Sequence, residues 1–348
     1  MGDMAAMASL EASPVNVARL CEFLGARSGV PVVAEGCTRL TGGAIQQNWK
    51  VDLRFGAGAN APWTSGAYVL RTDSASTISA SLSRATEFSV LRLAHRAGVA
   101  CPEPIAFSDD RSIIGAPFFI MRWSPGVAAG HRLVRDDALV PDRRLLVRQI
   151  AQSMARLHGV RPDTARIEGF VHSADPTRRL IADLRAYLDT LAICFPALEW
   201  GLRCAEKALP ARERSTLVHR DLRTGNYLVH QGGLSAILDW EFAAWANPME
   251  DLGWFTARCW RFGAFEREAG GVGLLGDFLH AYEESGGEHM EREHLTLWQL
   301  IAHLRWAVIA LQQAQRHITG TERSMELALT GRLVPELEQE VILLADQL

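Results

Sequence analysis

Residues 217–230 read LVHRDLRTGNYLVH, and residues 234–241 read LSAILDWE. This region holds two apolar runs of strand length, 226–230 and 234–240. A Gln-Gly-Gly tripeptide at 231–233 separates them, and this composition favours a tight turn. The sequence therefore predicts a small β-hairpin with polar residues at the ends of its strands.

Five polar residues surround the predicted hairpin. His219 and Asp221 follow an apolar run, Asn226 opens the hairpin, and Asp239 and Glu241 close it. Because the chain turns back between them, we expect Asp221, Asn226 and Asp239 to lie close together. Carboxylate and amide oxygens are ligands that Mg²⁺ prefers, and Mg²⁺ retains positions for substrate phosphates. The cluster predicts a Mg²⁺ site with one carboxylate left as a base, the arrangement that phosphoryl transfer requires.

The residues before this region predict a β-rich first lobe. Alternating apolar residues indicate strands, and apolar residues at helical spacing indicate helices. The predicted elements are a helix, a hairpin, a strand, a helix and a closing strand, over residues 14–30, 38–55, 67–72, 77–98 and 116–123. We place the end of this lobe at Trp123.

The second lobe, residues 124–348, is predicted to be mainly helical. Residues 145–160 show strong helical periodicity, and further helices are expected over 176–194, over 197–209 and in the last hundred residues. Strands gathered in one part of the chain and helices in the other are typical of the α+β class. We expect a cleft between the lobes.

Composition excludes several classes of protein. The 348 residues carry 36 Lys and Arg against 40 Asp and Glu, a formal net charge of −4, which offers no general attraction to nucleic acid. The cysteines form no C-x-x-C pair, which argues against a zinc site. The apolar stretch 297–311 is interrupted by Gln299, His303 and Arg305 and predicts a buried helix, not a membrane span. The simplest interpretation is a cytoplasmic protein without nucleic-acid or membrane partners.

The motifs carry a family resemblance. His219-Arg220-Asp221, Asn226 and Asp239 match the H-x-D-x-x-x-x-N and acidic metal motifs of the protein-kinase-like superfamily. The sequences HRDLRTGNYLV and LDWEFAAWANPMEDLGWF resemble the aminoglycoside phosphotransferase family more narrowly. The resemblance is strongest to the branch found beside, or fused to, acyl-CoA dehydrogenases. It extends from about residue 40 to the C-terminal helices and implies a bilobal protein-kinase-like fold.

The resemblance implies a role for each residue of the cluster. Asp221 looks like the base that accepts a hydroxyl proton, and Asn226 and Asp239 look like Mg²⁺ ligands. Glu241 lies beside the metal. His219 looks like a support for the catalytic loop, and a further aspartate, Asp251, is expected to brace that loop.

The first lobe is expected to bind ATP. Gly42 and Gly43 would let backbone N–H groups approach phosphates, although a plain hairpin turn explains them too. The resembling kinases place a cation on their third strand, paired with an acid on the next helix, and Arg71 and Glu87 match these positions. Lys50 lies too close to the glycine turn to take this role.

The adenine would lie against the closing strand, near Phe119, Met121 and Trp123.

The segment after Asp239 indicates the size of the acceptor. Only residues 240–246 separate Asp239 from Asn247, which leaves no room for a peptide-binding platform, so a small molecule is favoured over a protein. The helical lobe offers arginines and tryptophans as candidate acceptor contacts. They are Trp254, Arg258, Trp260, Arg261, His303, Arg305 and Trp306.

The sequence thus predicts an ATP- and Mg²⁺-dependent O-phosphotransferase acting on a hydroxyl of a small molecule. Arginine-rich surroundings favour an anionic or hydroxyacyl-CoA-type acceptor over a polycation, and the resemblance implies a functional link to acyl-CoA dehydrogenase metabolism. The alternatives are an aminoglycoside-type antibiotic kinase and a nucleotide-binding pseudokinase with a regulatory role. A protein kinase and a metal-dependent hydrolase are less favoured.

Overall fold

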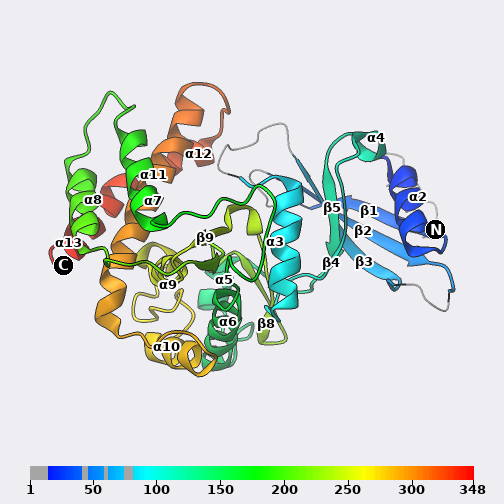
Figure 1. Cartoon of the computed structure of the whole chain (residues 1–348), viewed down its shortest axis with the longest axis horizontal. Coiled ribbons are helices and arrows are strands. Elements are labelled where there is room, and N and C mark those ends of the chain that lie inside the picture. The colour runs from blue at the N-terminus through cyan, green and yellow to red at the C-terminus, as the bar shows by residue number, and fades with distance from the viewer. Residues whose placement is uncertain (1–14, 41–45, 59–61, 74–80) are drawn as a thin grey trace.

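The computed structural model describes residues 15–40, 46–58, 62–73 and 81–348. An antiparallel sheet and a group of helices occupy opposite ends of the molecule, which confirms the expected α+β class (Figure 1). The strands follow the order β1-β2-β3-β5-β4 across the sheet. Their bounds are β1 (Val32–Arg39), β2 (Gln46–Phe55), β3 (Gly66–Asp73), β4 (Pro104–Ser108) and β5 (Phe118–Arg122).

One face of the sheet is apolar. Trp49, Leu70 and Ile120 are register partners on three neighbouring strands, so their side chains share this face. They form a hydrophobic core with Leu24 of helix α2 (Val17–Ser28), which covers the face on the outer side of the sheet. This packing holds the strands in register, because a slip by one residue would turn the apolar side chains out of the core.

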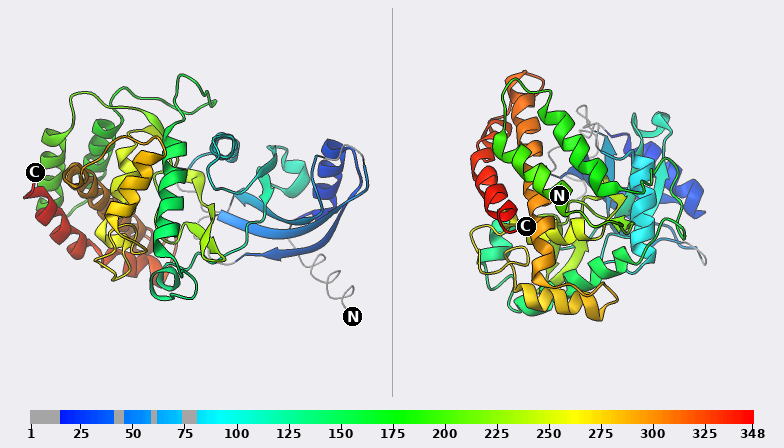
Figure 2. Two further views of the ribbon diagram at one scale, coloured as in Figure 1. Left: turned by 90° about the horizontal axis from the view of Figure 1, so that it is seen from below. Right: turned by 60° about the vertical axis from the view of Figure 1, so that its left-hand side comes forward.

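The other face of the sheet carries the residues expected to meet the nucleotide. Arg71 of β3 lies opposite Phe119 of β5 and opposite Asn48 of β2, and Met121 follows on the same face. Helix α3 (Arg84–Arg96) packs against this side of the sheet. The view from below shows the sheet extending away from the helices (Figure 2, left).

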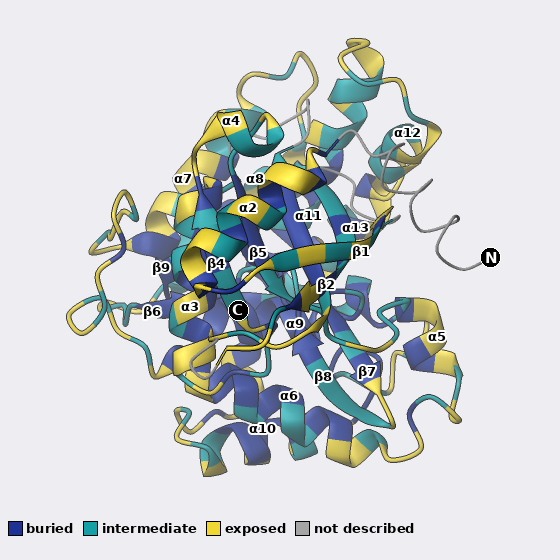
Figure 3. Ribbon diagram, turned by 90° about the vertical axis from the view of Figure 1, so that its right-hand side faces the viewer, coloured by how far each residue is buried: buried dark blue, intermediate teal, exposed yellow. Residues whose placement is uncertain are grey.

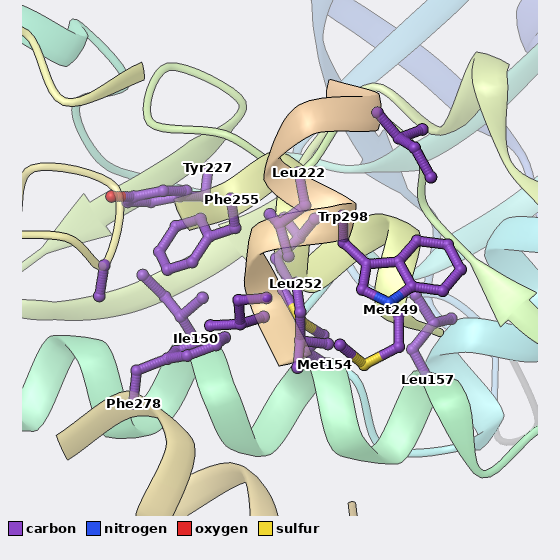
Figure 4. Close-up of a cluster of buried hydrophobic side chains, with 14 of the residues drawn as sticks. Ile150, Met154, Leu157, Leu222, Tyr227, Met249, Leu252, Phe255, Phe278 and Trp298 are labelled. Atoms are coloured by element: carbon purple, nitrogen blue, oxygen red, sulfur yellow. The ribbon is translucent and has the colours of Figure 1, made fainter. Parts of the chain in front are cut away.

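The helical part has its own large hydrophobic core. Side chains of α6, α9, α10 and α11 interdigitate there, including Met154, Phe255, Phe278 and Trp298 (Figure 4). The first half of α11 is buried by its neighbours (Figure 3). The remaining helices are α4 (Arg111–Ile114), α5 (Gly130–Arg135), α6 (Arg143–His158), α7 (Pro176–Leu188), α8 (Pro196–Ala208), α9 (Met249–Thr256), α10 (Leu275–Glu284), α11 (Leu295–Ile318), α12 (Met325–Gly331) and α13 (Val334–Ala345). Within the described ranges, no helix combines the length and the hydropathy that a membrane crossing requires.

The predicted hairpin is confirmed as β7 (Tyr227–His230) and β8 (Gly233–Ile237). Gln231 and Gly232 form its two-residue turn with φ of 50° and 79°, the left-handed pair that a type I′ turn requires. Just before the hairpin, β6 (Thr216–Val218) pairs with β9 (Ala244–Ala246). The two pairs of strands hold both ends of the segment that connects β6 to β7.

Two predicted boundaries differ from the structure. Helix α3 begins at Arg84, after the non-helical residues 81–83, because the hydroxyl of Ser83 accepts the N–H of Thr86 and caps the helix there. The predicted start near residue 77 lies outside the described residues. Strand β1 begins at Val32, six residues before the predicted hairpin strand. Its register shifts between Ala34 and Gly36, which interrupts the apolar alternation that would have indicated a strand.

The packing of α9 against α11 gives the first testable prediction. A Cβ on Gly253 would lie 2.5 Å from the backbone of Trp298, so Gly253→Ala overpacks this contact and is expected to lower the free energy of unfolding by about 1–3 kcal/mol. In α10, a Cβ on Gly276 meets nothing within 4 Å, so Gly276→Ala is expected to raise stability by about 0.5 kcal/mol. Urea titration of both variants measures the difference, and equal stability of the two would contradict the packing.

Candidate active site

The segment between β6 and β7, residues 219–226, is held by the carboxylate of Asp251. The backbone N–H groups of His219 and Arg220 each donate a hydrogen bond to this carboxylate, with N···O distances of 2.7 Å. Arg220 has a left-handed φ of 64°, a strained conformation for a non-glycine residue. Its side chain also pairs with Glu250 at 3.1 Å. The position expected for Asp251 is confirmed, because two contacts from α9 hold the strained residue in place.

Asp251 is itself fixed by a buried chain of polar groups. Nε2 of His158, in α6, lies 3.2 Å from the carboxylate, and Nδ1 of His158 lies 2.7 Å from the hydroxyl of Tyr282 in α10. Burial opposes the charged form of Asp251, but the hydrogen bond and charge of His158 outweigh it, so the pKa of Asp251 is lowered. Sequence reasoning missed His158, because its partners are distant along the chain.

His219 connects the segment to the hairpin. Nε2 of His219 donates to the carbonyl oxygen of Leu238 at 2.9 Å, while Nδ1 accepts the N–H of Asp221 at 3.2 Å. One nitrogen donates and the other accepts, so the ring is neutral with its proton on Nε2. The ring also packs on Trp240, with centroids 4.6 Å apart. These contacts are those of a supporting residue, because both ring nitrogens are occupied by the backbone.

Asp221, the carboxylate expected to act as the base, is buried, with 9% of its surface accessible. Nδ2 of Asn226 donates to its Oδ2 at 2.6 Å, and Nε1 of Trp254 donates to its Oδ1 at 3.1 Å. Burial raises the pKa of Asp221 against the opposing charge of Arg223, and the negative charge of Asp239 adds to the rise. A carboxylate with a raised pKa and fixed orientation is suited to accept a proton.

Asp239 and Arg71 bring the sheet and the hairpin together. Nη2 of Arg71 lies 2.7 Å from Oδ1 of Asp239, and Nε of Arg71 lies 2.9 Å from Glu87 in α3. Burial opposes ionisation of Asp239, but Arg71 outweighs it and the pKa of Asp239 is lowered. The Asp239 side chain stays 35% exposed, whereas Arg71 is 8% exposed. The predicted pair of Arg71 and Glu87 is therefore present, and Asp239 joins it.

Glu241 lies on the buried side of this ion-pair cluster. It is 3.8 Å from Arg71 and 4.0 Å from Arg84, and the hydroxyl of Ser81 donates to it. Sequence reasoning missed Arg84, which also binds Glu87 and lies 3.0 Å from Asp73. The i to i+3 spacing of Arg84 and Glu87 on one helix was the available signal. A metal role for Glu241 stays a prediction, and its carboxylate contacts Arg71, Arg84 and Ser81.

The remaining predicted residues are spread more widely. Gly42 and Gly43 lie outside the described residues. Met121 and Phe119 both lie on the same face of the sheet as Arg71, and Phe119 packs against Phe88, with centroids 5.8 Å apart. Lys50 pairs with Asp52 at 3.2 Å and contacts neither Asp239 nor Glu87 among the ion pairs of the described chain.

The cluster offers oxygen ligands from two directions. Nδ2 of Asn226 is engaged with Asp221, so its carbonyl oxygen is directed away from that residue, and Asp239 adds a partly exposed carboxylate. Within the described ranges, no three His, Cys, Asp or Glu side chains gather to hold a metal ion. Two protein oxygens with the remaining positions open to phosphates and water fit Mg²⁺ and do not fit a metal that needs a closed protein cage.

The chain matches the model of a known protein family. Residues 36–316 match the model of the Phosphotransferase enzyme family, APH. The chain belongs to this family. The resemblance inferred from the HRD and LDWE motifs is thereby confirmed.

Relatives and solved structures agree with this assignment. The chain is 24% identical over 270 residues to acyl-CoA dehydrogenase family member 11 of Pongo abelii, covering 73% of this chain and 34% of that protein. The chain thus spans about a third or less of the length of the curated relatives it matches.

A Ralstonia eutropha structure, provisionally assigned as an aminoglycoside phosphotransferase, matches with TM-score 0.74 and 18% identity over 95% of this chain and 98% of its own. A thermostable mutant of aminoglycoside phosphotransferase APH(4)-Ia, in a ternary complex with AMP-PNP and hygromycin B, matches with TM-score 0.54 and 15% identity over 94% and 98%. These matches confirm the expected kinase-like fold.

The contacts of Asp251 give the second prediction. Asp251→Asn keeps the shape of the side chain but removes the charge that accepts two backbone N–H groups, so the free energy of unfolding at pH 7 is expected to fall by about 3 kcal/mol. The pKa of Asp251 is lowered in the folded protein. Its stabilisation is therefore complete above the ordinary value of 3.8 and is lost as pH falls through the lower folded-state pKa.

Urea titrations of wild type and Asp251→Asn from pH 7 to pH 3 measure this difference. We expect the gap in unfolding free energy to narrow below about pH 4. A gap of the same size across the whole range would show that the charge of Asp251 is not what stabilises the segment.

Proposed function

We propose that the protein is an ATP- and Mg²⁺-dependent O-phosphotransferase that acts on a hydroxyl group of a small molecule. One observation carries the proposal: Asp221 and Asn226 share a direct hydrogen bond, and Asp239, at the end of the same hairpin, binds Arg71 of the sheet. A base, two oxygen ligands and a cation for phosphate are the parts that in-line phosphoryl transfer needs. Membership of the phosphotransferase family supports the same reaction class.

Each residue has a distinct task in the proposed reaction. The carboxylate of Asp221 accepts the proton of the acceptor hydroxyl as that oxygen attacks the γ-phosphorus of ATP. The bond from this phosphorus to the bridging oxygen of the β-phosphate breaks, and ADP leaves. Asn226 and Asp239 would hold Mg²⁺, which when bound neutralises charge on the phosphates. Arg71 exchanges its contact with Asp239 for a phosphate oxygen, to which its planar guanidinium can donate two hydrogen bonds. Glu87, Glu241 and His219 keep these groups in place.

The two parts of the chain would divide the substrates between them. We assign nucleotide binding to residues 1–123, whose polar sheet face carries Arg71 and Met121. We assign catalysis and acceptor binding to residues 124–348, which carry Asp221 and the arginine- and tryptophan-bearing helices around it. AMP-PNP in the structurally similar aminoglycoside phosphotransferase supports ATP as the donor.

The surroundings of Asp221 favour an anionic acceptor. Arg223 lies 3.4 Å from Asp221 and 4.7 Å over the ring of Trp260, and Arg305 lies 4.5 Å over the ring of Trp254. Two guanidinium groups would repel a polycationic aminoglycoside and attract a carboxylate or phosphate. An acyl-bearing alcohol such as a hydroxyacyl-CoA fits this environment, and relatives named for acyl-CoA dehydrogenase support the same metabolic link.

A pseudokinase is the second candidate, favoured by one contact. Arg71 already pairs with Asp239, so binding of Mg²⁺ to Asp239 has to compete with a guanidinium. A protein that binds nucleotide without turnover would use this competition as a switch. The intact set of Asp221, Asn226 and Asp239 favours the enzyme.

The third prediction separates these functions. Asp221→Asn removes the proton acceptor, so turnover is expected to fall about 10²- to 10⁴-fold while Mg·ATP affinity stays unchanged. Asp239→Asn removes a metal ligand, so Mg·ATP affinity is expected to fall more than about 10-fold. ADP release over a panel of acyl-CoA, sugar and aminoglycoside alcohols measures turnover, and calorimetry measures affinity.

The matched control is Asp137→Asn, the same chemical change at a side chain that is 87% exposed and outside the cluster. It is expected to behave as wild type in both assays. Full turnover in Asp221→Asn would refute the proposed base. Nucleotide binding by wild type, with no ADP released on any acceptor, would favour the pseudokinase.

A further inference from the structure

Helix α9 contacts the segment 219–226 at a third point beyond Glu250 and Asp251. Trp254, one turn further along the helix, lies on the same side and directs its indole Nε1 at Oδ1 of Asp221, 3.1 Å away. The sequence had indicated Trp254 only as a candidate acceptor contact. Its polar atom is instead engaged with the proposed base.

The two oxygens of Asp221 are held by different neutral donors. Asn226 donates to Oδ2 from the hairpin, and Trp254 donates to Oδ1 from α9. A carboxylate held at both oxygens cannot rotate about its terminal bond without losing both hydrogen bonds. The plane of the Asp221 carboxylate is therefore fixed by side chains from two separate elements.

The indole of Trp254 is also immobilised. It is 2% exposed, so water does not compete for its N–H. The guanidinium of Arg305, in α11, lies 4.5 Å over the ring, and Arg305 donates to the carbonyl oxygen of Arg220. Trp260 also packs on the Trp254 ring, with centroids 5.1 Å apart. The donor reaching Asp221 is therefore as rigid as the core around it.

We propose that Trp254 is a positioning residue for the phosphoryl transfer, whose indole N–H fixes the Asp221 carboxylate in the orientation that receives the acceptor proton. This inference rests on the proposed role of Asp221 as the base. Arg305 assists by tying the Trp254 ring to the backbone of Arg220. A misoriented base lowers the reaction rate, because proton transfer requires close alignment of donor and acceptor in the transition state.

The fourth prediction concerns Trp254→Phe, which keeps an aromatic ring and removes the N–H. We expect kcat to fall about 10- to 100-fold, with KM and the calorimetric Kd for Mg·ATP unchanged. If no acceptor has been identified, hydrolysis of ATP with water as the acceptor supplies the rate. Trp245→Phe is the matched control, because Trp245 in β9 is similarly buried, at 5% exposure, and packs on Phe170. It is expected to retain the wild-type kcat.

A second measurement does not depend on activity. In protein labelled with ¹⁵N-tryptophan, the Nε1–H resonance of Trp254 is expected to shift in Asp221→Asn, and the resonance of Trp245 is expected to stay in place. An unmoved Trp254 resonance would overturn the hydrogen bond. This spectrum is informative even if Trp254→Phe does not fold.

The outcomes separate the two proposals. Wild-type kcat in Trp254→Phe, together with loss of turnover in Asp221→Asn, would overturn the positioning role and leave the proposed function standing. Wild-type turnover in Asp221→Asn would refute the proposed base, on which the positioning role rests, whatever the spectrum shows of the hydrogen bond. No turnover by the wild type on any acceptor would overturn the proposed function itself. A lowered kcat in both variants, with the Trp254 resonance shifted in Asp221→Asn, supports both proposals.

Discussion

The carboxylate of Asp251 is the interaction on which the rest of the site depends. It accepts the backbone N–H groups of His219 and Arg220, and so it determines where Asp221 emerges from the strand that precedes it. Arg220 adopts a left-handed conformation that its side chain disfavours, and such strain persists only where surrounding contacts over-determine it. His158 and Tyr282 then connect this carboxylate to α6 and α10, which places the support of the site inside the largest hydrophobic core.

Residues of helix α9 support the segment 219–226 at several points. Glu250, Asp251 and Trp254 contact Arg220, the backbone and Asp221 in turn, so a single helix reaches three consecutive residues of the reacting segment. The close approach of Gly253 to Trp298 sets the helix against α11. Because α11 also supplies Arg305, the orientation of the proposed base depends on packing between helices as much as on the segment that carries it.

Features that depend on neighbouring residues were predicted well from the sequence. Contacts between residues far apart in the sequence were not. The hairpin and the hydrogen bond between Asp221 and Asn226 lie within one short stretch, so spacing and turn composition were enough to predict both. Arg71 and Glu87 followed from the family resemblance, and their contact is present. Arg84, His158 and the direction of the Trp254 indole depend on packing between elements far apart in sequence, which periodicity does not encode. The late start of α3 shows the same limit, because a capping hydrogen bond at Ser83 decided it.

The ion pair between Arg71 and Asp239 joins residues 168 positions apart and brings the sheet into contact with the hairpin. Its guanidinium has already given up most of its hydration in the folded protein. A phosphate bound here as proposed would replace one anion by another at a guanidinium that is already desolvated and oriented, so the main desolvation cost would have been met during folding. Phosphate binding at this point would be an exchange of partners within a preorganised site, and selectivity among anions would depend on how well each one reproduces the geometry of the departing carboxylate.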